Sequence, residues 1–169
     1  NASLGQEVLS RNDELSEIGI SALSMQRSLR NLLEQDTLTG LSNRRFGDQK
    51  LSETHRRFTE NGTPYVLCIG DIDYFKSVND TYGHECGDEV LKAVGKVMRK
   101  EMHGSGCVAR WGGEEFLLIY EGATLSEANA YAEAMLSRIR ELKVPYEGNE
   151  IRITMTLGLA QATADIDIN

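Results

Sequence analysis

The protein is a chain of 169 residues, of which 40% are hydrophobic and 26% are charged, a balance typical of one globular domain with a short additional segment. Its formal net charge at pH 7 is −8, which argues against broad binding to nucleic acids or anionic membranes, because both need a basic surface. A polyanionic ligand would therefore need the help of a metal ion.

The first 34 residues carry a heptad pattern. Apolar residues recur at alternating intervals of four and three, with Arg11 as the polar exception: Leu4, Val8, Leu15, Ile18, Ala22, Met25, Leu29 and Leu32. Such a narrow apolar stripe predicts a coiled-coil stalk helix over residues 1–34 that forms a homodimer. The alternative is an amphipathic helix that packs on its own domain.

The remaining residues, 35–169, are predicted to form one domain. A break rich in Thr, Gly, Ser and Asn opens it, and the apolar periodicity then changes from element to element. The expected elements, in chain order, are a helix over 44–61, a central strand covered on both faces over 65–73, a helix over 88–102, a hairpin over 107–120, a helix over 125–142, an extended piece at 144–146 and a strand over 151–162. This mixture of helices with an antiparallel hairpin predicts the α+β class.

Cysteine usage and hydropathy suggest the compartment. The three cysteines, Cys68, Cys86 and Cys107, form no CxxC pair, so we expect reduced packing residues in a cytoplasmic protein. No apolar run of 18 residues and no signal peptide occurs, so no direct membrane contact is expected. The chain does not begin with Met, and we expect it to be a piece of a longer protein, for which a membrane anchor remains open.

Four acidic residues lie at the ends of two apolar strands. Asp71 and Asp73 close the 65–73 strand, while Glu114 and Glu115 follow a Gly-Gly pair that we expect to form a two-residue hairpin turn, of the kind that tolerates positive φ. If the hairpin pairs beside that strand, the carboxylates converge at one edge of the sheet, where they need a cation among them. Hard oxygen ligands select Mg²⁺ or Ca²⁺ over zinc. The alternative is that the acids are solvated residues at a hairpin tip.

The run RWGGEEF at 110–116 resembles the GG[DE]EF signature of the GGDEF family, the bacterial diguanylate cyclases. The rest of the family pattern occurs in order within about residues 34–162, as DTLTGLSNRR and then DIDYFKSVNDTYGHECGDEVL. The resemblance implies a palm-like, mainly antiparallel sheet flanked by helices, similar to class III nucleotide cyclases. It also implies the condensation of two GTP into cyclic di-GMP and two pyrophosphates, in bacterial second-messenger signalling.

The resemblance also assigns catalytic and metal-binding roles. Mg²⁺, with Mn²⁺ as the alternative ion, would be held by Asp71, the carbonyl of Ile72 and Glu114. Glu115 would be the base for the 3′-hydroxyl, and Asp73 would support the site. The glycines of the signature would let the backbone approach the nucleotide, because they have no Cβ. These two glycines are Gly112 and Gly113.

The nucleotide would be bound by residues that follow the first strand. The main-chain amides of the loop formed by Tyr74, Phe75 and Lys76 would hold the phosphates, and catalytic Lys76 would offset their charge. The resemblance assigns guanine to Asn79 and Asp88, with His84 lining the pocket; a carboxylate and an amide suit its pattern of donors and acceptors. Taken singly, these residues have ordinary readings: a turn at Asn79, a helix cap at Asp88 and a partly buried imidazole at His84.

The sequence departs from the family pattern in two places. The product-inhibition motif RxxD falls on His103 and Gly106, so we expect that site to be absent, although Arg110 matches a basic position common in the family. The family's C-terminal helix, with a Lys and an Arg for the β- and γ-phosphates, is missing from this sequence. We therefore expect it to bind GTP more weakly than its parent does.

The resemblance further implies partners. Each phosphodiester of the product joins the 3′-hydroxyl of one nucleotide to the α-phosphate of the other, so two domains must face each other, tethered by the stalk and adjusted by an upstream sensor. Three alternatives remain open: a module that binds GTP as a sensor without turnover, a cyclase that accepts adenine in one site, and a structural dimerisation protein. The last would leave the acids unexplained.

Overall fold

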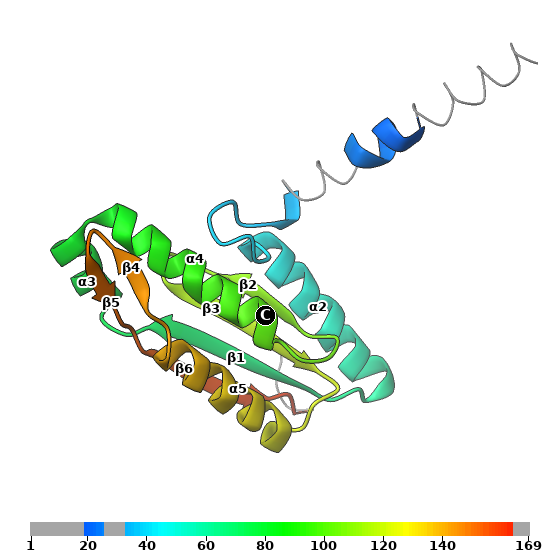
Figure 1. Ribbon diagram of the computed structural model, residues 1–169. Coiled ribbons are helices and arrows are strands. Elements are labelled where there is room, and N and C mark those ends of the chain that lie inside the picture. Colours follow the sequence, from blue (N-terminus) through cyan, green and yellow to red (C-terminus); the bar gives the residue numbers. More distant parts are fainter. Residues whose placement is uncertain (1–18, 26–32, 164–169) are drawn as a thin grey trace, which may run out of the picture. The chain divides into compact units, whose positions relative to one another are not determined.

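The computed structural model describes residues 19–25 and 33–163 (Figure 1). The chain divides into two compact units, Asn1–Glu34 and Gln35–Asn169. In the first unit, residues 19–25 are helical, and the side chains of Ile20, Leu23 and Met25 are 67%, 60% and 65% exposed. Most of the predicted heptad positions, namely Leu4, Val8, Arg11, Leu15, Ile18, Leu29 and Leu32, lie outside the described residues. The coiled coil therefore remains a prediction.

A four-stranded antiparallel sheet with the order β2-β3-β1-β6 forms the framework of the second unit. Its strands are β1 (Tyr65–Ile72), β2 (Cys107–Arg110), β3 (Glu115–Glu121) and β6 (Met155–Gln161). β1 pairs with β3 on one side and β6 on the other, so its predicted central position is confirmed. Its predicted burial on both faces is only partly correct, because Ile69 is 41% exposed.

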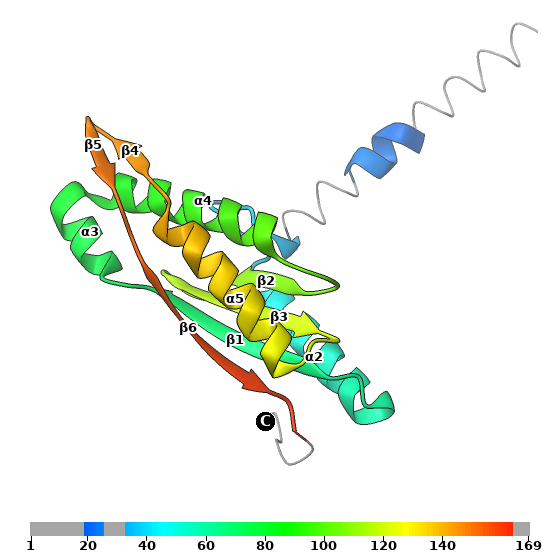
Figure 2. The ribbon, with the colours of Figure 1, turned by 60° about the horizontal axis from the view of Figure 1, so that its bottom comes forward.

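Helices cover the two faces of this sheet unequally (Figure 2). Helices α4 (His84–Glu101) and α5 (Leu125–Arg140) pack on one face, and α2 (Arg44–Asn61) packs on the other, mainly over β2 and β3. Local signals fix the ends of α2: the side chain of Asn43 accepts a hydrogen bond from the Phe46 amide, and Gly62 follows with φ 72°. Within the described residues, no helix is long and apolar enough to cross a membrane.

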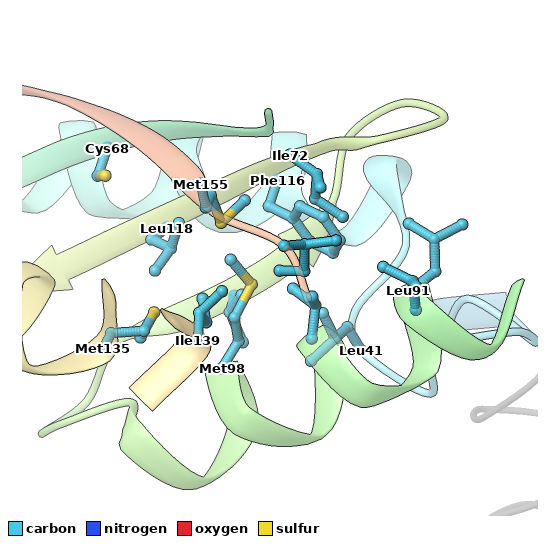
Figure 3. Packing of buried hydrophobic residues seen from close by; sticks show 14 of the residues in the cluster. Leu41, Cys68, Ile72, Leu91, Met98, Phe116, Leu118, Met135, Ile139 and Met155 are labelled. Carbon is cyan, nitrogen blue, oxygen red and sulfur yellow. The ribbon is translucent and has the colours of Figure 1, made fainter. Parts of the chain in front are cut away.

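The side chains of β3 point alternately to the two faces of the sheet, and both faces are covered, which explains its unbroken apolar run. Phe116 and Leu118 point into the larger core under α4 and α5, whereas Leu117 and Ile119 point to α2 on the opposite face. Figure 3 shows the larger core, in which residues from the sheet meet residues from both helices: Cys68, Ile72, Met98, Phe116, Leu118, Met135, Ile139 and Met155. These strands are therefore held firmly from both sides, which fixes the loops at their ends.

Two predicted boundaries are wrong for local reasons. The short helix α3 (Phe75–Tyr82) was not expected, and α4 begins at His84 rather than at residue 88, because Gly83 with φ 85° makes the corner between the two helices. The predicted strand over 151–162 is broken. Its first part is β5 (Asn149–Ile151), which pairs with β4 (Val144–Tyr146) in a separate hairpin, and the chain re-enters the main sheet at Met155.

Candidate active site

The hairpin loop that carries the glycines is longer than predicted. Arg110 pairs with Phe116 across the hairpin, and the amides of Trp111 and Gly112 both donate to the carbonyl of Glu115, at 2.8 and 3.2 Å. The loop is therefore the three residues 112–114 rather than the predicted two-residue turn, and neither of its glycines adopts a positive φ. Because the Glu115 carbonyl accepts two amides, this wider loop closes without left-handed backbone.

The first glycine of the loop leaves room for a neighbouring side chain. A Cβ on Gly112 would lie 2.6 Å from Oε2 of Glu115, so the Glu115 carboxylate would have to move from the position it has here. A Cβ on Gly113 would meet nothing within 4 Å. The two glycines thus have different local requirements: Gly112 accommodates the Glu115 carboxylate, whereas Gly113 leaves open space in front of the loop.

Pairing of β1 with β3 brings the predicted acids to one end of the sheet. Asp71 lies directly opposite Glu115 in the antiparallel register, and the amide of Ile72 donates to the carbonyl of Glu114 at 3.3 Å. Asp73 follows immediately and accepts a hydrogen bond of 2.8 Å from the hydroxyl of Thr156 on β6. The register therefore places the acids at the end of β1 beside the acids at the start of β3, although the two pairs are more than forty residues apart in sequence.

The electrostatics of this cluster favour a cation. Burial raises the pKa of Asp71, and the charges of Glu115 and Asp73 raise it further. Burial likewise raises the pKa of Glu114, with added repulsion from Asp71 and Glu115. Within the part of the chain that the structure describes, no group of three or more His, Cys, Asp or Glu side chains is arranged to hold a metal ion. The donor set on offer is two carboxylates with a backbone carbonyl, which suits a hard divalent ion.

Arg110 anchors the hairpin loop to a distant segment. Its Nε and Nη2 donate to the carbonyl of Gly113 at 3.2 and 2.8 Å, while Nη1 lies 3.3 Å from both carboxylate oxygens of Asp36. Asp36 also accepts two hydrogen bonds from Thr39, at 2.8 and 2.7 Å. Burial alone would raise the pKa of Asp36, but these hydrogen bonds and the charge of Arg110 lower it.

Asp36 has a structural role at the site that the sequence reasoning missed. Its signal in the sequence is its place in the run DTLTGL, which predicts a break between helix and domain and belongs to the family pattern but indicates no partner for Asp36. The structure shows a closed turn there instead, in which the Gly40 amide donates to the Asp36 carbonyl at 2.8 Å. The Asp36–Arg110 pair is partly buried, with side-chain exposures of 21% and 17%, so solvent screens it less than a surface pair.

The predicted phosphate-binding loop is the start of a helix. Tyr74 has a left-handed backbone with φ 56° and is the N-cap of α3, so Phe75 and Lys76 form the first turn rather than a loop. The first amides of a helix lack intrahelical acceptors and can bind anions. Phe75 is buried and holds this turn against the core, while Tyr74 is 87% exposed and Lys76 is exposed.

The three residues assigned to guanine lie on either side of the α3–α4 corner. Asn79 is inside α3 and partly buried, while His84 and Asp88 lie in the first two turns of α4 and are exposed. The turn interpretation of Asn79 and the cap interpretation of Asp88 are therefore wrong, because both are within helices. The corner itself is closed by a hydrogen bond of 2.9 Å from the Gly83 amide to the Asn79 carbonyl.

The position of the missing inhibitory motif has its own packing. The ring of His103 stacks on Tyr131, with centroids 4.5 Å apart and planes at 22°. A Cβ on Gly106 would lie 2.0 Å from the terminal methyl of Met102 and 2.6 Å from the carbonyl of Ile119. The backbone carbonyl cannot swing aside as a flexible side chain can. This local structure has no room for an aspartate at residue 106.

Comparison with known proteins agrees with this geometry. The family model described as "Diguanylate cyclase, GGDEF domain" matches residues 33–167. "Diguanylate cyclase DosC" of Shigella sonnei is 35% identical over 132 residues, which are 78% of this chain and 29% of that protein. "Diguanylate cyclase A" of Treponema denticola is 37% identical over 102 residues, 60% of this chain and 27% of that protein. The chain thus spans less than a third of these relatives.

Solved structures show the same fold. The coiled coil and GGDEF domain of DgcB from Caulobacter crescentus, solved in complex with c-di-GMP, matches with a TM-score of 0.80 and 26% identity, over 92% of this chain and 83% of that one. Diguanylate cyclase SiaD from Pseudomonas aeruginosa, in complex with its activator SiaC, matches with a TM-score of 0.77 and 32% identity. That match covers 98% of this chain and 65% of the other.

Proposed function

This chain belongs to the diguanylate cyclase GGDEF family, and we propose that its 35–169 domain condenses two GTP into cyclic di-GMP and two pyrophosphates. The observation that carries the proposal is the register of β1 with β3. It sets Asp71 opposite Glu115 and hydrogen-bonds Ile72 to Glu114, so that the acids of two separate segments share one end of the sheet.

In this proposal the metal ion is Mg²⁺, held by Asp71, the Ile72 carbonyl and Glu114. The fit rests on the chemistry of these groups: two carboxylates whose pKa values are raised by burial and then by neighbouring acidic side chains, beside a backbone oxygen. When bound, the ion would offset charge on the α-phosphate and on the leaving pyrophosphate.

The chain's own residues would bind and orient the two substrates. Glu115, which is exposed, would accept the proton of a 3′-hydroxyl presented by the second nucleotide. The 3′-oxygen would form a bond to the α-phosphorus of the first nucleotide as the bond to pyrophosphate breaks. Lys76 and the first amides of α3 would hold the phosphates. Asn79 and Asp88, with His84 beside them, would select guanine over adenine.

Because each domain would bind one GTP, the proposal includes a homodimer brought together by the stalk and an upstream sensor that adjusts it. The three cysteines are free and buried, which suits a reducing compartment, and GTP is a cytoplasmic metabolite, so we place the domain in the cytoplasm. This assignment of two facing domains, like the metal, is part of the proposal.

Incubation of the protein with GTP and Mg²⁺, followed by separation of the nucleotides by chromatography, tests the proposal. The expected result is cyclic di-GMP with two pyrophosphates for each product molecule. Recovery of bound but unchanged GTP would favour a sensor module instead, and an adenine-containing product from mixed nucleotides would favour a cyclase of different specificity. Either result would contradict the proposed activity.

Replacing Arg110 with Ala should lower kcat about tenfold and leave the KM for GTP nearly unchanged, because charged hydrogen bonds of this kind stabilise by about 1.5–3 kcal/mol. The loop that carries Glu114 would lose its contact at Gly113 and its link to Asp36. Steady-state kinetics would measure this. The control is Arg138→Ala, which removes only an exposed pair with Glu141. Equal kcat values for the two variants would contradict the anchoring role.

Cyclic di-GMP should not inhibit this protein through the usual inhibitory site. Neither His103 nor Gly106 can supply a bidentate guanidinium or a carboxylate, and Gly106 is packed too closely to accept a side chain. Initial rates measured against added cyclic di-GMP should show at most weak competition with GTP. Non-competitive inhibition at micromolar product would show that a second site exists.

A further inference from the structure

Helix α4 contains a glycine that its backbone does not require. Gly87 lies in the first turn of α4, it is buried, and it does not adopt a positive φ. A glycine inside a helix costs about 1 kcal/mol relative to alanine, so its presence needs another physical reason.

The space beside Gly87 is filled by two side chains of α3. A Cβ on Gly87 would lie 2.0 Å from Oδ1 of Asn79, 3.0 Å from Cγ of the same residue and 3.1 Å from Cζ of Phe75. The end of the Asn79 side chain therefore occupies the place that a Cβ would take. The glycine lets α3 approach α4 closely enough for Asn79 to lie against the α4 backbone.

Packing, rather than hydrogen bonding, positions the Asn79 amide. Within the described part of the chain, this side chain makes no hydrogen bond to another protein group, although its backbone carbonyl accepts the Gly83 amide at 2.9 Å. Gly83 and Gly87 are linked in turn, by a hydrogen bond of 3.3 Å from the Gly87 amide to the Gly83 carbonyl. The backbone corner is thus fixed, while the amide remains able to bind a ligand.

We propose that Gly87 is a positioning residue for guanine recognition, acting through Asn79. Because Gly87 has no Cβ, the end of the Asn79 side chain can lie against the α4 backbone, next in sequence to Asp88. The two predicted guanine contacts then come from helices whose separation is set at this one position. The inference rests on the proposed function, because Asn79 reads a base only if this domain binds GTP.

The substitution Gly87→Ala separates this role from a role in stability. Oδ1 is at the free end of a flexible side chain, so Asn79 can rotate away, and the Phe75 ring, 3.1 Å from the added Cβ, has to shift only slightly. Alanine is the better helix former, which offsets that shift, so the thermal unfolding temperature should change little. The displaced amide, in contrast, should no longer meet the base.

The experiment measures binding of 3′-deoxy-GTP with Mg²⁺ by calorimetry, because this nucleotide lacks the hydroxyl that reacts. Gly87→Ala should raise its Kd about tenfold, as expected for one lost hydrogen bond to a ligand. With GTP, KM should rise about tenfold while kcat stays within about twofold. The matched control is Gly158→Ala on β6, where a Cβ would meet nothing within 4 Å, so it should leave the Kd unchanged.

A double-mutant cycle with Asn79→Ala decides how Gly87 acts. In that background, Gly87→Ala should have no further effect on the Kd. If Gly87→Ala weakens nucleotide binding equally in the parent and in the Asn79→Ala protein, Gly87 does not act through Asn79 and the inference is wrong. The inference is also wrong if Gly87→Ala unfolds the domain and Asn79→Ala does not restore the fold. If Asn79→Ala weakens binding but Gly87→Ala does not, the inference alone fails. If Asn79→Ala changes nothing, the proposed guanine contact fails as well.

Discussion

Glu115→Gln should lower the turnover of GTP by about 10² or more while the domain stays folded. The amide keeps the shape of the side chain, so it still fits the space that Gly112 leaves free. It cannot accept the proton of the 3′-hydroxyl, because a carboxamide is not a base at neutral pH. Initial rates of cyclic di-GMP formation measure the expected loss of turnover, and thermal unfolding measures whether the domain stays folded.

Two further measurements isolate the chemical step. The Glu115→Gln protein should bind 3′-deoxy-GTP with a Kd within a few-fold of the parent, because Glu115 is not among the predicted contacts to the base or phosphates. The control substitution is Glu133→Gln, at an exposed residue of α5 whose carboxylate lies 3.9 Å from Arg140. Near-normal product formation by Glu115→Gln would remove this residue from the catalytic role.

Much of the fold and of the acidic cluster could be predicted because the signals are local and strong. The run 65–73 is apolar and ends in two acids, so its place inside a sheet with the acids at one end follows from the pattern alone. The hairpin signal at the glycines is equally local. Only the register, which sets Asp71 opposite Glu115, requires the structure, and the family resemblance supplied the expectation that the two ends meet.

Features that depend on contacts between distant segments could not be predicted. Arg110 and Asp36 are more than seventy residues apart, and no periodicity of either segment indicates their ion pair. Likewise, the role proposed for Gly87 depends on how closely α3 approaches α4, which the sequences of the two helices do not reveal. The hairpin loop differs from prediction for the same reason: its length is set by which carbonyl accepts the Trp111 and Gly112 amides.

The ion pair also connects the start of the domain to the site. Asp36 is the second residue of the unit that begins at Gln35, and Arg110 links it directly to the carbonyl of Gly113. Gly113 precedes Glu114, a predicted metal ligand. A displacement of the chain at residues 35–36 would therefore act on the loop that carries this ligand. The stalk predicted over residues 1–34 would end next to this link.

Charges placed in the heptad stripe should separate the two domains. Ala22→Glu with Met25→Glu would put like charges at two neighbouring layers of the predicted seam. The dimer would also lose the burial of the Met25 side chain, and burial of such a side chain stabilises an interface by about 1.5–3 kcal/mol. The dimer should dissociate, which light scattering measures. The globular domain should stay folded, because the two buried clusters that the structure describes begin at Leu38 and at Phe46 and contain no residue of the first unit.

Turnover per chain should then depend strongly on protein concentration, since two GTP-loaded domains would have to meet by diffusion rather than at the high effective concentration that a tether gives. Rates measured over about a hundredfold range of concentration test this. The matched control is Ile20→Glu with Ser24→Glu, which makes equally drastic changes on the same helix but off the heptad stripe, and should leave the dimer intact. If the seam variant remains dimeric, or if the parent is monomeric at tens of micromolar, residues 1–34 form a helix that packs on its own domain, and another surface must bring the two sites together.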